Sequence, residues 1–221
     1  MAIRHAPYQP KTEFIRARVV GKTVLDLGCV QHSLDRLFQA PDRWLHNVIR
    51  ENATSVLGVD ILEKEIAELQ RMGYNMLAGD ATTLRLAERF DVVVCGDLIE
   101  HLTNPGALLE TIAYHLKPDG VGLITTPNPF AADRFFNVFF DGWTGINPEH
   151  TCWFCPQTIY QLAERTGLRV DELVWIETAF KSSTKKPFWR LFANPIGSWV
   201  ARRNQKMRLD FGVTLKRQTV T

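Results

Sequence analysis

Aspartates and glycines close several short apolar segments of this sequence, and these residue types suit the binding of a nucleotide-like ligand. They are Asp26, Gly28, Asp60, Asp80, Gly96 and Asp97. If the apolar segments are parallel strands, their carboxyl ends meet at one edge of a sheet, where open α/β folds bind ligands. Asp60 could then accept hydrogen bonds from two ribose hydroxyls, and Asp80 with the N–H of Ala81 could match the edge of adenine. A single aspartate in such a position is more often a helix cap, so the argument depends on the whole set.

Glu100 and His101 follow directly after the fourth of these segments, in the stretch DLIEH. Histidine is a suitable general base for a hydroxyl group because its pKa lies near neutral pH, and Glu100 could assist it. His150, in the stretch NPEH, is the second candidate base. The alternative is that Glu100 and His101 only cap or orient the helix that follows them.

The cysteines point to no special chemistry. Four cysteines do not make a disulfide framework in a chain of this size. Cys152 and Cys155 have the C-x-x-C spacing of zinc and redox sites, but there is no second pair to complete a zinc site and the context is not thioredoxin-like. We therefore expect plain thiols.

Short apolar runs alternate with helical patterns along the chain, which is typical of βαβ units around a parallel sheet. Five strands are expected at 23–28, 55–60, 75–80, 90–96 and 120–126. These runs are too apolar to leave one face exposed, so helices must cover both faces of the sheet. The covering helices are expected at 33–39, 63–73, 104–120 and 156–167.

Two further strands are expected near the C-terminus, at 168–178 and 211–218, and the last could pair with its predecessor as an antiparallel edge. The segment between them, 181–209, is then an insertion. Residues 181–221 hold ten Lys or Arg and one acid, a balance of +9, so the first 180 residues carry 2 − 9 = −7. Such a basic tail could face a phosphate, an anionic membrane or nucleic acid, or could be a solvated surface.

Aromatic and basic residues alternate within the insertion, over about 185–208. That mixture suits peripheral contact with a membrane, where aromatic rings lie at headgroup depth and cations meet anionic lipid. It equally suits a flap over a ligand pocket. The sequence has no recognisable RNA-binding module, so we do not expect a nucleic-acid partner.

The length of 221 residues fits one domain with a full-sized core. The N-terminal stretch lacks the apolar region of a signal peptide, and no uninterrupted apolar run approaches the roughly 18 residues of a membrane span. We expect a cytoplasmic protein, peripheral to the membrane if the insertion binds lipid. Its oligomeric state is not indicated by any motif.

Five motifs, taken together and in order, resemble those of the class I S-adenosylmethionine-dependent methyltransferases: VLDLGC, VLGVDI, GDA, FDVVVCGDLIEHL and LKPDGVGLITTPN. The resemblance covers about residues 22–170. It implies a Rossmann-like α/β fold with a seven-stranded, mostly parallel sheet, helices on both faces and an antiparallel last strand. It also implies that 1–221 is a single methyltransferase domain with S-adenosylmethionine as cofactor. The implied cofactor-binding residues are Asp26, Gly28, Cys29, Asp60, Ile61, Asp80, Ala81, Gly96 and Asp97.

The first loop departs from that family. Methyltransferases usually have Gly-x-Gly-x-Gly there, whereas this chain has Val30 and His32 in place of the second and third glycines. Neither residue enters left-handed backbone geometry cheaply, so the loop must take another path around the methionine end of the cofactor. The missing glycines also argue against a dinucleotide dehydrogenase.

Two branches of the family, the ubiquinone-pathway O-methyltransferases and the small-RNA 2′-O-methyltransferases, have a metal-binding Glu-x-x-Glu-His stretch that the segment 97–101 resembles. Asp97 stands here for the first Glu, and the resemblance implies that Asp97, Glu100, His101 and His150 are candidate ligands of a divalent metal such as Mg²⁺, Mn²⁺ or Zn²⁺. Metal-free relatives share the Glu-His step, so the metal stays a hypothesis.

The acceptor is the least defined part of the prediction. Asn128, Pro129 and Phe130, with the phenylalanine-rich stretch 134–140, predict a lid on the acceptor side, although half of these aromatics could simply face the core. A loose likeness of GCVQHS and NPEHTCWF to polysaccharide-pathway methyltransferases favours O-methylation of a sugar, glycan precursor or other small molecule. An RNA 2′-O-methyltransferase, or an inactive methyltransferase fold that serves as a binding protein, is the alternative.

Overall fold

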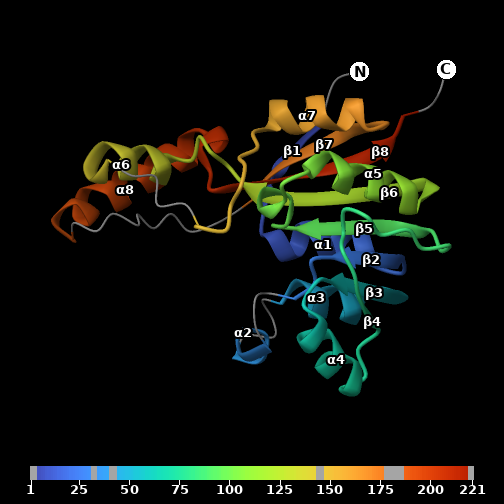
Figure 1. Ribbon diagram of the computed structural model, residues 1–221. Coiled ribbons are helices and arrows are strands. Elements are labelled where there is room, and N and C mark those ends of the chain that lie inside the picture. Colours follow the sequence, from blue (N-terminus) through green and yellow to red (C-terminus); the bar gives the residue numbers. More distant parts are fainter. Residues whose placement is uncertain (1–3, 31–33, 40–43, 143–146, 177–186, 219–221) are drawn as a thin grey trace.

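The computed structural model describes residues 4–30, 34–39, 44–142, 147–176 and 187–218, which form an α/β fold around one central sheet (Figure 1). The strands run in the order β1-β7-β8-β6-β5-β2-β3-β4. All seven expected strands are present. They are β2 (Thr23–Leu27), β3 (Ser55–Asp60), β4 (Met76–Ala78), β5 (Phe90–Gly96), β6 (Leu116–Pro127), β7 (Leu168–Ile176) and β8 (Asp210–Arg217).

The sheet is mostly parallel, and β8 runs antiparallel to both of its neighbours, β6 and β7. The predicted fold class is therefore confirmed. The prediction that β8 lies at an edge is wrong, because β8 is inserted between β6 and β7. Its side chains Phe211, Val213 and Leu215 are buried, and Phe14 lies against Gly212, so both faces of the strand are covered. An unpredicted eighth strand, β1 (Arg4–Gln9), pairs in parallel with β7.

Alternating side chains of the strands fill two separate cores on the two faces of the sheet. On one face Leu25 and Val93 pack with α5 (Pro105–His115) and α7 (Pro156–Arg165). On the other face Val24 and Val92 pack with α1 (Lys11–Val19) and α3 (Leu45–Asn52). A third cluster joins α2 (Leu34–Gln39) and α4 (Glu63–Arg71). The two-sided burial explains why the strand sequences are apolar throughout.

The helix predicted at 104–120 is shorter than expected. Asn104 caps α5 by accepting a hydrogen bond from the Ala107 N–H, but the helix ends at His115 and β6 begins at Leu116. Pro118 cannot continue a helix. Lys117 instead forms an ion pair with Asp91, with 2.9 Å between Nζ and Oδ1, which holds the start of β6 against β5.

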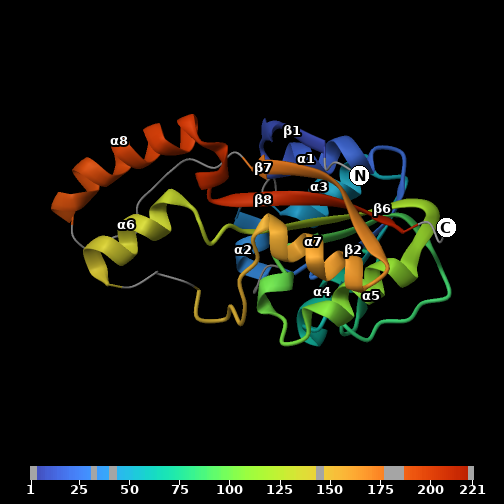
Figure 2. The same cartoon turned by 90° about the horizontal axis from the view of Figure 1, so that it is seen from above.

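Two helices extend away from the sheet as a pair (Figures 1 and 2). They are α6 (Ala132–Asp141), which follows β6, and α8 (Pro187–Arg203), which precedes the short η3 turn (Gln205–Met207) and β8. We call them the outer helix pair. Within the described chain, no helix combines the length and apolar character needed to cross a membrane.

Candidate functional site

A cleft of about 590 Å³ opens at the carboxyl edge of the sheet, where β2, β3 and β5 end. Gly28, Asp60, Ile61, Gly96 and Asp97 line it, together with His101 and His150. The volume lies in the range of small-molecule and cofactor sites. The strand-end residues singled out from the sequence therefore do meet at one place, as the parallel sheet requires.

Asp60 organises the side of this cleft at the end of β3. It ends β3, and its two carboxylate oxygens accept hydrogen bonds from the Val30 N–H at 2.8 Å and the Leu62 N–H at 3.2 Å. Burial raises the pKa of Asp60, while the bonds from Val30 and Leu62 act to lower it. Each carboxylate oxygen has two lone pairs, so Asp60 retains acceptor capacity for further hydroxyl groups. Gln31 and His32, the next residues of the loop, lie outside the described residues.

A side lobe of about 240 Å³ continues the cleft past Asp60 toward β4. Ile61 and Ala81 line this lobe, and the Ile61 side chain is 69% exposed, which leaves an apolar surface available to a flat ring. Asp80 also lines the lobe, and its Oδ1 accepts hydrogen bonds from the N–H and the hydroxyl of Thr82, both at 2.7 Å. Asp80 thus caps a turn, the alternative raised by its sequence position, while facing the lobe.

A smaller cavity of about 160 Å³ adjoins the cleft on its other side and shares Gly28, Gly96 and Asp97 with it. Cys29 and Asp26 line this cavity, and both side chains are buried. Gly28 has a φ of 74°, a left-handed conformation that glycine adopts without strain. Gly28, which was singled out from the sequence, therefore lies at the turn that brings the backbone to the cavity.

Lys11, the first residue of α1, reaches into this cavity and forms an ion pair with Asp97. The other oxygen of Asp97 accepts a hydrogen bond from the Thr125 hydroxyl at 2.8 Å. Loss of hydration would raise the pKa of Asp97, but the attraction and hydrogen bond of Lys11 outweigh it, so the pKa lies below its usual value. Asp97 is thereby held as an anion beside the cation of Lys11.

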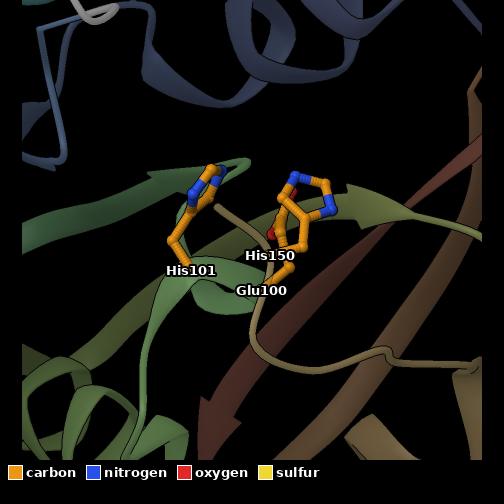
Figure 3. Close-up of side chains that lie close together, drawn as sticks. All are labelled: Glu100, His101 and His150. Atoms are coloured by element: carbon orange, nitrogen blue, oxygen red, sulfur yellow. The ribbon is translucent and has the colours of Figure 1, made fainter. Parts of the chain in front are cut away.

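Glu100, His101 and His150 come together at the mouth of the cleft (Figure 3). One ligand atom from each of the three side chains lies within 4.8 Å of the others, and the two imidazole rings are 4.6 Å apart in an edge-on arrangement. Glu100 and His101 belong to the η2 turn (Ile99–His101) that follows β5. His150 belongs to the connection between α6 and α7.

Backbone contacts hold His150 opposite the η2 turn. The N–H groups of Thr151 and Cys152 donate to the Glu100 carbonyl at 2.9 and 3.3 Å, and the Thr151 hydroxyl donates to the Leu102 carbonyl at 2.8 Å. Two segments that lie far apart in the sequence are thus fixed against each other, as a precise site requires.

The carboxyl group of Glu100 is buried with incomplete hydrogen bonding. Its Oε2 accepts from the Thr126 hydroxyl at 3.0 Å, whereas its Oε1 has no hydrogen-bond partner among the described residues. Burial raises the pKa of Glu100 to about 8, and the negative charge of Asp97 adds to the effect. Burial, followed by the repulsion of His101 and Arg134, lowers the pKa of His150. The lowered pKa favours the neutral form of His150, which is able to accept a proton.

Asp97 does not belong to the cluster of Glu100, His101 and His150, although the sequence placed it among the metal-ligand candidates. Its carboxylate faces Lys11 and Thr125 instead. Cys152 and Cys155 are free thiols, as predicted, and Cys155 occupies the N-cap of α7.

The expected acceptor lid does not cover the cleft. Helix α6 extends away from it, and Phe135 and Phe139 of that helix are exposed and line neither the cleft nor the core. Asn128 and Pro129 of the expected lid do line a narrow recess with Glu100, His150 and Trp153, and the guanidinium of Arg134 lies over the Trp153 ring at 5.6 Å.

Sequence reasoning missed Lys11 and His46. His46 lies in α3 and lines the smaller cavity beside Asp26. Neither helix was predicted, although the spacing of Phe14, Ile15 and Val19 is that of a helix face. Without α1 and α3, nothing in the sequence relates these side chains to the strand ends.

Comparison with known proteins agrees with this architecture. A family model described as a methyltransferase domain matches residues 2–173. Ubiquinone biosynthesis O-methyltransferases are similar in sequence: the enzyme of Rickettsia canadensis is 26% identical over 130 residues (54% of this chain, 55% of that protein), and that of Coxiella burnetii is 27% identical over 172 residues (71% of this chain, 67% of that protein). The matched parts thus cover 55% and 67% of the length of these two relatives.

A crystal structure of an S-adenosylmethionine-dependent methyltransferase from Archaeoglobus fulgidus has the same fold, with a TM-score of 0.57 over 94% of this chain and 95% of the other at 20% identity. The chain therefore belongs to the methyltransferase domain family. S-adenosylmethionine is the cofactor of this class. The strand-end residues fit it, because the carboxylate of Asp60 lies between an apolar lobe and a cavity that contains the cation of Lys11 and the anion of Asp97.

Proposed function

We propose that the chain transfers a methyl group from S-adenosylmethionine to a hydroxyl oxygen of a small acceptor, a sugar or glycan precursor in particular. One observation supports oxygen as the acceptor atom: His150 and His101 lie beside Glu100 at the mouth of the cleft, next to Asp97 and Gly96 at the end of β5. A hydroxyl is a weak nucleophile until it loses its proton, and a neutral imidazole near the methyl donor can accept that proton.

The chain's residues would act by position and proton transfer. S-adenosylmethionine supplies the methyl group on a positively charged sulfur. Asp60 and the lobe around Ile61 would hold the nucleoside end, which leaves the opposite end toward Lys11 and Asp97. His150 would take the hydroxyl proton of the acceptor, whose oxygen would bond to the methyl carbon as the sulfur–methyl bond breaks. Alignment of the two reactants supplies much of the rate.

The same cluster could also hold a divalent metal. The donor set of one carboxylate and two imidazoles suits Mn²⁺ or Zn²⁺, and the buried Oε1 of Glu100 lacks a partner among the described residues, as expected of a ligand atom. A cation held by Glu100, His101 and His150 would lower the pKa of an acceptor hydroxyl. Asp97 is not needed for this site.

Two observations bear on the acceptor class. The similar ubiquinone biosynthesis enzymes are O-methyltransferases by name, which supports oxygen. The indole of Trp153 lies beside His150 in the narrow recess with the guanidinium of Arg134 over one face of its ring, so a sugar could stack only on the other face. A phenolic acceptor would stack there as well, so the choice between the two classes must be measured.

The test is methyl transfer from labelled S-adenosylmethionine to nucleotide sugars and, in parallel, to catechols, with the methylated position read by mass spectrometry. A methyl ether on a sugar supports the full proposal, and a methyl ether on a catechol retains O-methylation but replaces the acceptor class. His150→Ala and Glu100→Gln should lose most of the activity, whereas Glu110→Gln, on the exposed side of α5, should not.

Chelation separates the two roles of the cluster. Activity that is lost on dialysis against a chelator and restored by Mn²⁺ or Zn²⁺ assigns Glu100, His101 and His150 to a metal. Activity that is unchanged by the chelator but lost in His150→Ala assigns His150 to proton transfer. Failure of the wild-type protein to bind S-adenosylmethionine at millimolar concentration would overturn the proposed function in favour of a binding protein with a methyltransferase fold.

A further inference from the structure

Helix α6 of the outer helix pair has its polar side turned inward. Its buried side chains include Asp133 and Asn137, one helical turn apart, whereas Phe135, Val138 and Phe139 are exposed. The Phe139 side chain is 71% exposed. A helix on the surface of a water-soluble protein has the opposite arrangement, with its apolar side toward the protein.

Helix α8 also exposes large apolar side chains. Phe188, Leu191, Ile196 and Trp199 are exposed, at intervals that keep them near one side of the helix, and Leu191 is 71% exposed. The least exposed of its described residues is the small Gly197. Large apolar side chains that face outward, as on both helices of the pair, are typical of helices that contact lipid.

The exposed apolar side chains are concentrated on this part of the molecule. Of the fourteen large hydrophobic residues exposed in the described part of the chain, eight lie between Phe130 and Trp199. Soluble proteins seldom expose such a concentration, and where they do, it marks a site of interaction.

The charge of the part of the chain that contains α8 indicates what covers the exposed apolar residues. Residues 181–209 contain eight Lys or Arg and no acid. Lys185 and Lys186 precede α8 in the sequence, and Arg202 and Arg203 end the helix, so basic residues flank the apolar stripe in the sequence. The guanidinium of Arg203 lies 5.6 Å from the ring centroid of Trp199. A second copy of this chain would bring like charges together in a symmetric dimer, whereas an anionic surface would attract them.

We propose that the outer helix pair is a membrane-docking element that lies in the headgroup region of an anionic bilayer. The phenylalanines of α6 and the stripe of α8 enter the boundary of the acyl chains, and Arg202 and Arg203 contact lipid phosphates. The combination of apolar area and cations is what holds an interfacial helix in place. The proposal does not depend on which acceptor the enzyme methylates.

Docking through this pair would bring the cleft to the membrane surface. Helix α6 leaves the sheet after Pro127, which lines the cleft and pairs with Asp210 at the start of β8. Asn128 ties the two connections together, because its side-chain amide donates to the carbonyls of Lys206 and Arg208 at 2.9 and 2.8 Å. The mouth of the site and the base of the pair are thus one rigid region, and a lipid-bound acceptor would arrive beside His150.

The test is co-sedimentation of the full chain with vesicles of phosphatidylcholine alone and of phosphatidylcholine mixed with phosphatidylglycerol. We expect binding to the anionic vesicles only. The variant Phe139→Ser/Leu191→Ser should lose this binding, and the matched control Val20→Ser/Met72→Ser, which changes exposed apolar residues elsewhere, should retain it. Arg202→Gln/Arg203→Gln should weaken binding by about 25-fold, or about fivefold for each cation.

Folding and cofactor binding provide the internal control, because all three variants should bind S-adenosylhomocysteine as the wild type does. Equal sedimentation of wild type and Phe139→Ser/Leu191→Ser would overturn the proposal. So would a dimer in light scattering that this variant dissociates, since the pair would then be a contact between two copies of the chain. Binding of single-stranded RNA that displaces the protein from anionic vesicles would show instead that the basic segment serves a nucleic acid.

Discussion

Asp26 and His46 form a buried pair in which Oδ2 of the carboxylate and Nδ1 of the imidazole lie 2.8 Å apart. Asp26 is 2% exposed and His46 is 1% exposed, and the pair joins β2 to α3. His46→Leu should lower the free energy of unfolding by about 3 kcal/mol, because the Asp26 carboxylate then stays buried without this partner. Urea denaturation followed by circular dichroism measures the loss.

Asn47→Ala, one position along on the same helix, removes only an exposed hydrogen bond to Glu51 and should cost less than about 0.5 kcal/mol. Asp26→Asn/His46→Leu, which removes the buried charge as well, should recover part of the stability lost in His46→Leu. If His46→Leu unfolds at the same urea concentration as Asn47→Ala, the pair does not stabilise the fold.

Asp60→Ala should lower the affinity for S-adenosylhomocysteine by about 10- to 100-fold, the effect of losing a charged acceptor of hydrogen bonds at the end of β3. Isothermal titration calorimetry measures the affinity. Because Asp60 also accepts bonds from the Val30 and Leu62 N–H groups, the thermal melting of the variant must be recorded in parallel. Glu63→Ala, three residues on in the first turn of α4, is the matched control. Unchanged affinity in Asp60→Ala would remove Asp60 from the cofactor site.

The sequence predicted the strands well because their signal is local. Val92 and Val94 face one core and Val93 faces the other, so a run of valines already implies a strand buried on both sides. The strand-end aspartates followed from the same reasoning, because parallel topology alone brings their positions to one edge.

The remaining features depend on tertiary contacts. Strand β1 contains Pro7 and polar residues, and it becomes a strand only by pairing with β7, about 168 residues later in the chain. The position of β8 results from its pairing with both β6 and β7, which no local pattern specifies. His46 reaches Asp26 because α3 packs against the face of the sheet that contains Val24, an arrangement that no local pattern specifies. The stretch 134–140 does not form the predicted lid, because aromatic residues at helical spacing indicate an apolar face of a helix but not what that face contacts.

Asp91 should contribute to the free energy of unfolding at neutral pH but not in strong acid. The Thr23 N–H, the Lys117 ammonium and the Thr23 hydroxyl lower the pKa of Asp91 from 3.8 to about 2. A carboxylate with a lowered pKa stabilises the fold fully above pH 3.8, and that contribution is lost as the pH falls through about 2. The Asp91 side chain is 32% exposed, so we expect Asp91→Asn to cost about 1 kcal/mol at pH 7. Urea denaturation at pH 7 and below pH 3.8 should show the difference from wild type shrinking in acid; a constant difference contradicts the assignment.

Lys11 and Asp97 should recognise the amino acid end of the cofactor. They place a cation and an anion in the cavity beside Gly28, and a zwitterion carries one group of each sign. Lys11→Met should weaken binding of S-adenosylhomocysteine about tenfold, the effect of one lost charged hydrogen bond. Methylthioadenosine has no amino acid end. Its affinity should stay within a factor of about two, because Lys11 does not line the lobe around Ile61 and substitutions at separate sites have nearly independent effects. Calorimetric titration of both ligands into wild type, Lys11→Met and the control Lys22→Met decides the matter: an equal loss for both ligands would mean that Lys11 acts by holding α1 in place and not by contacting the cofactor.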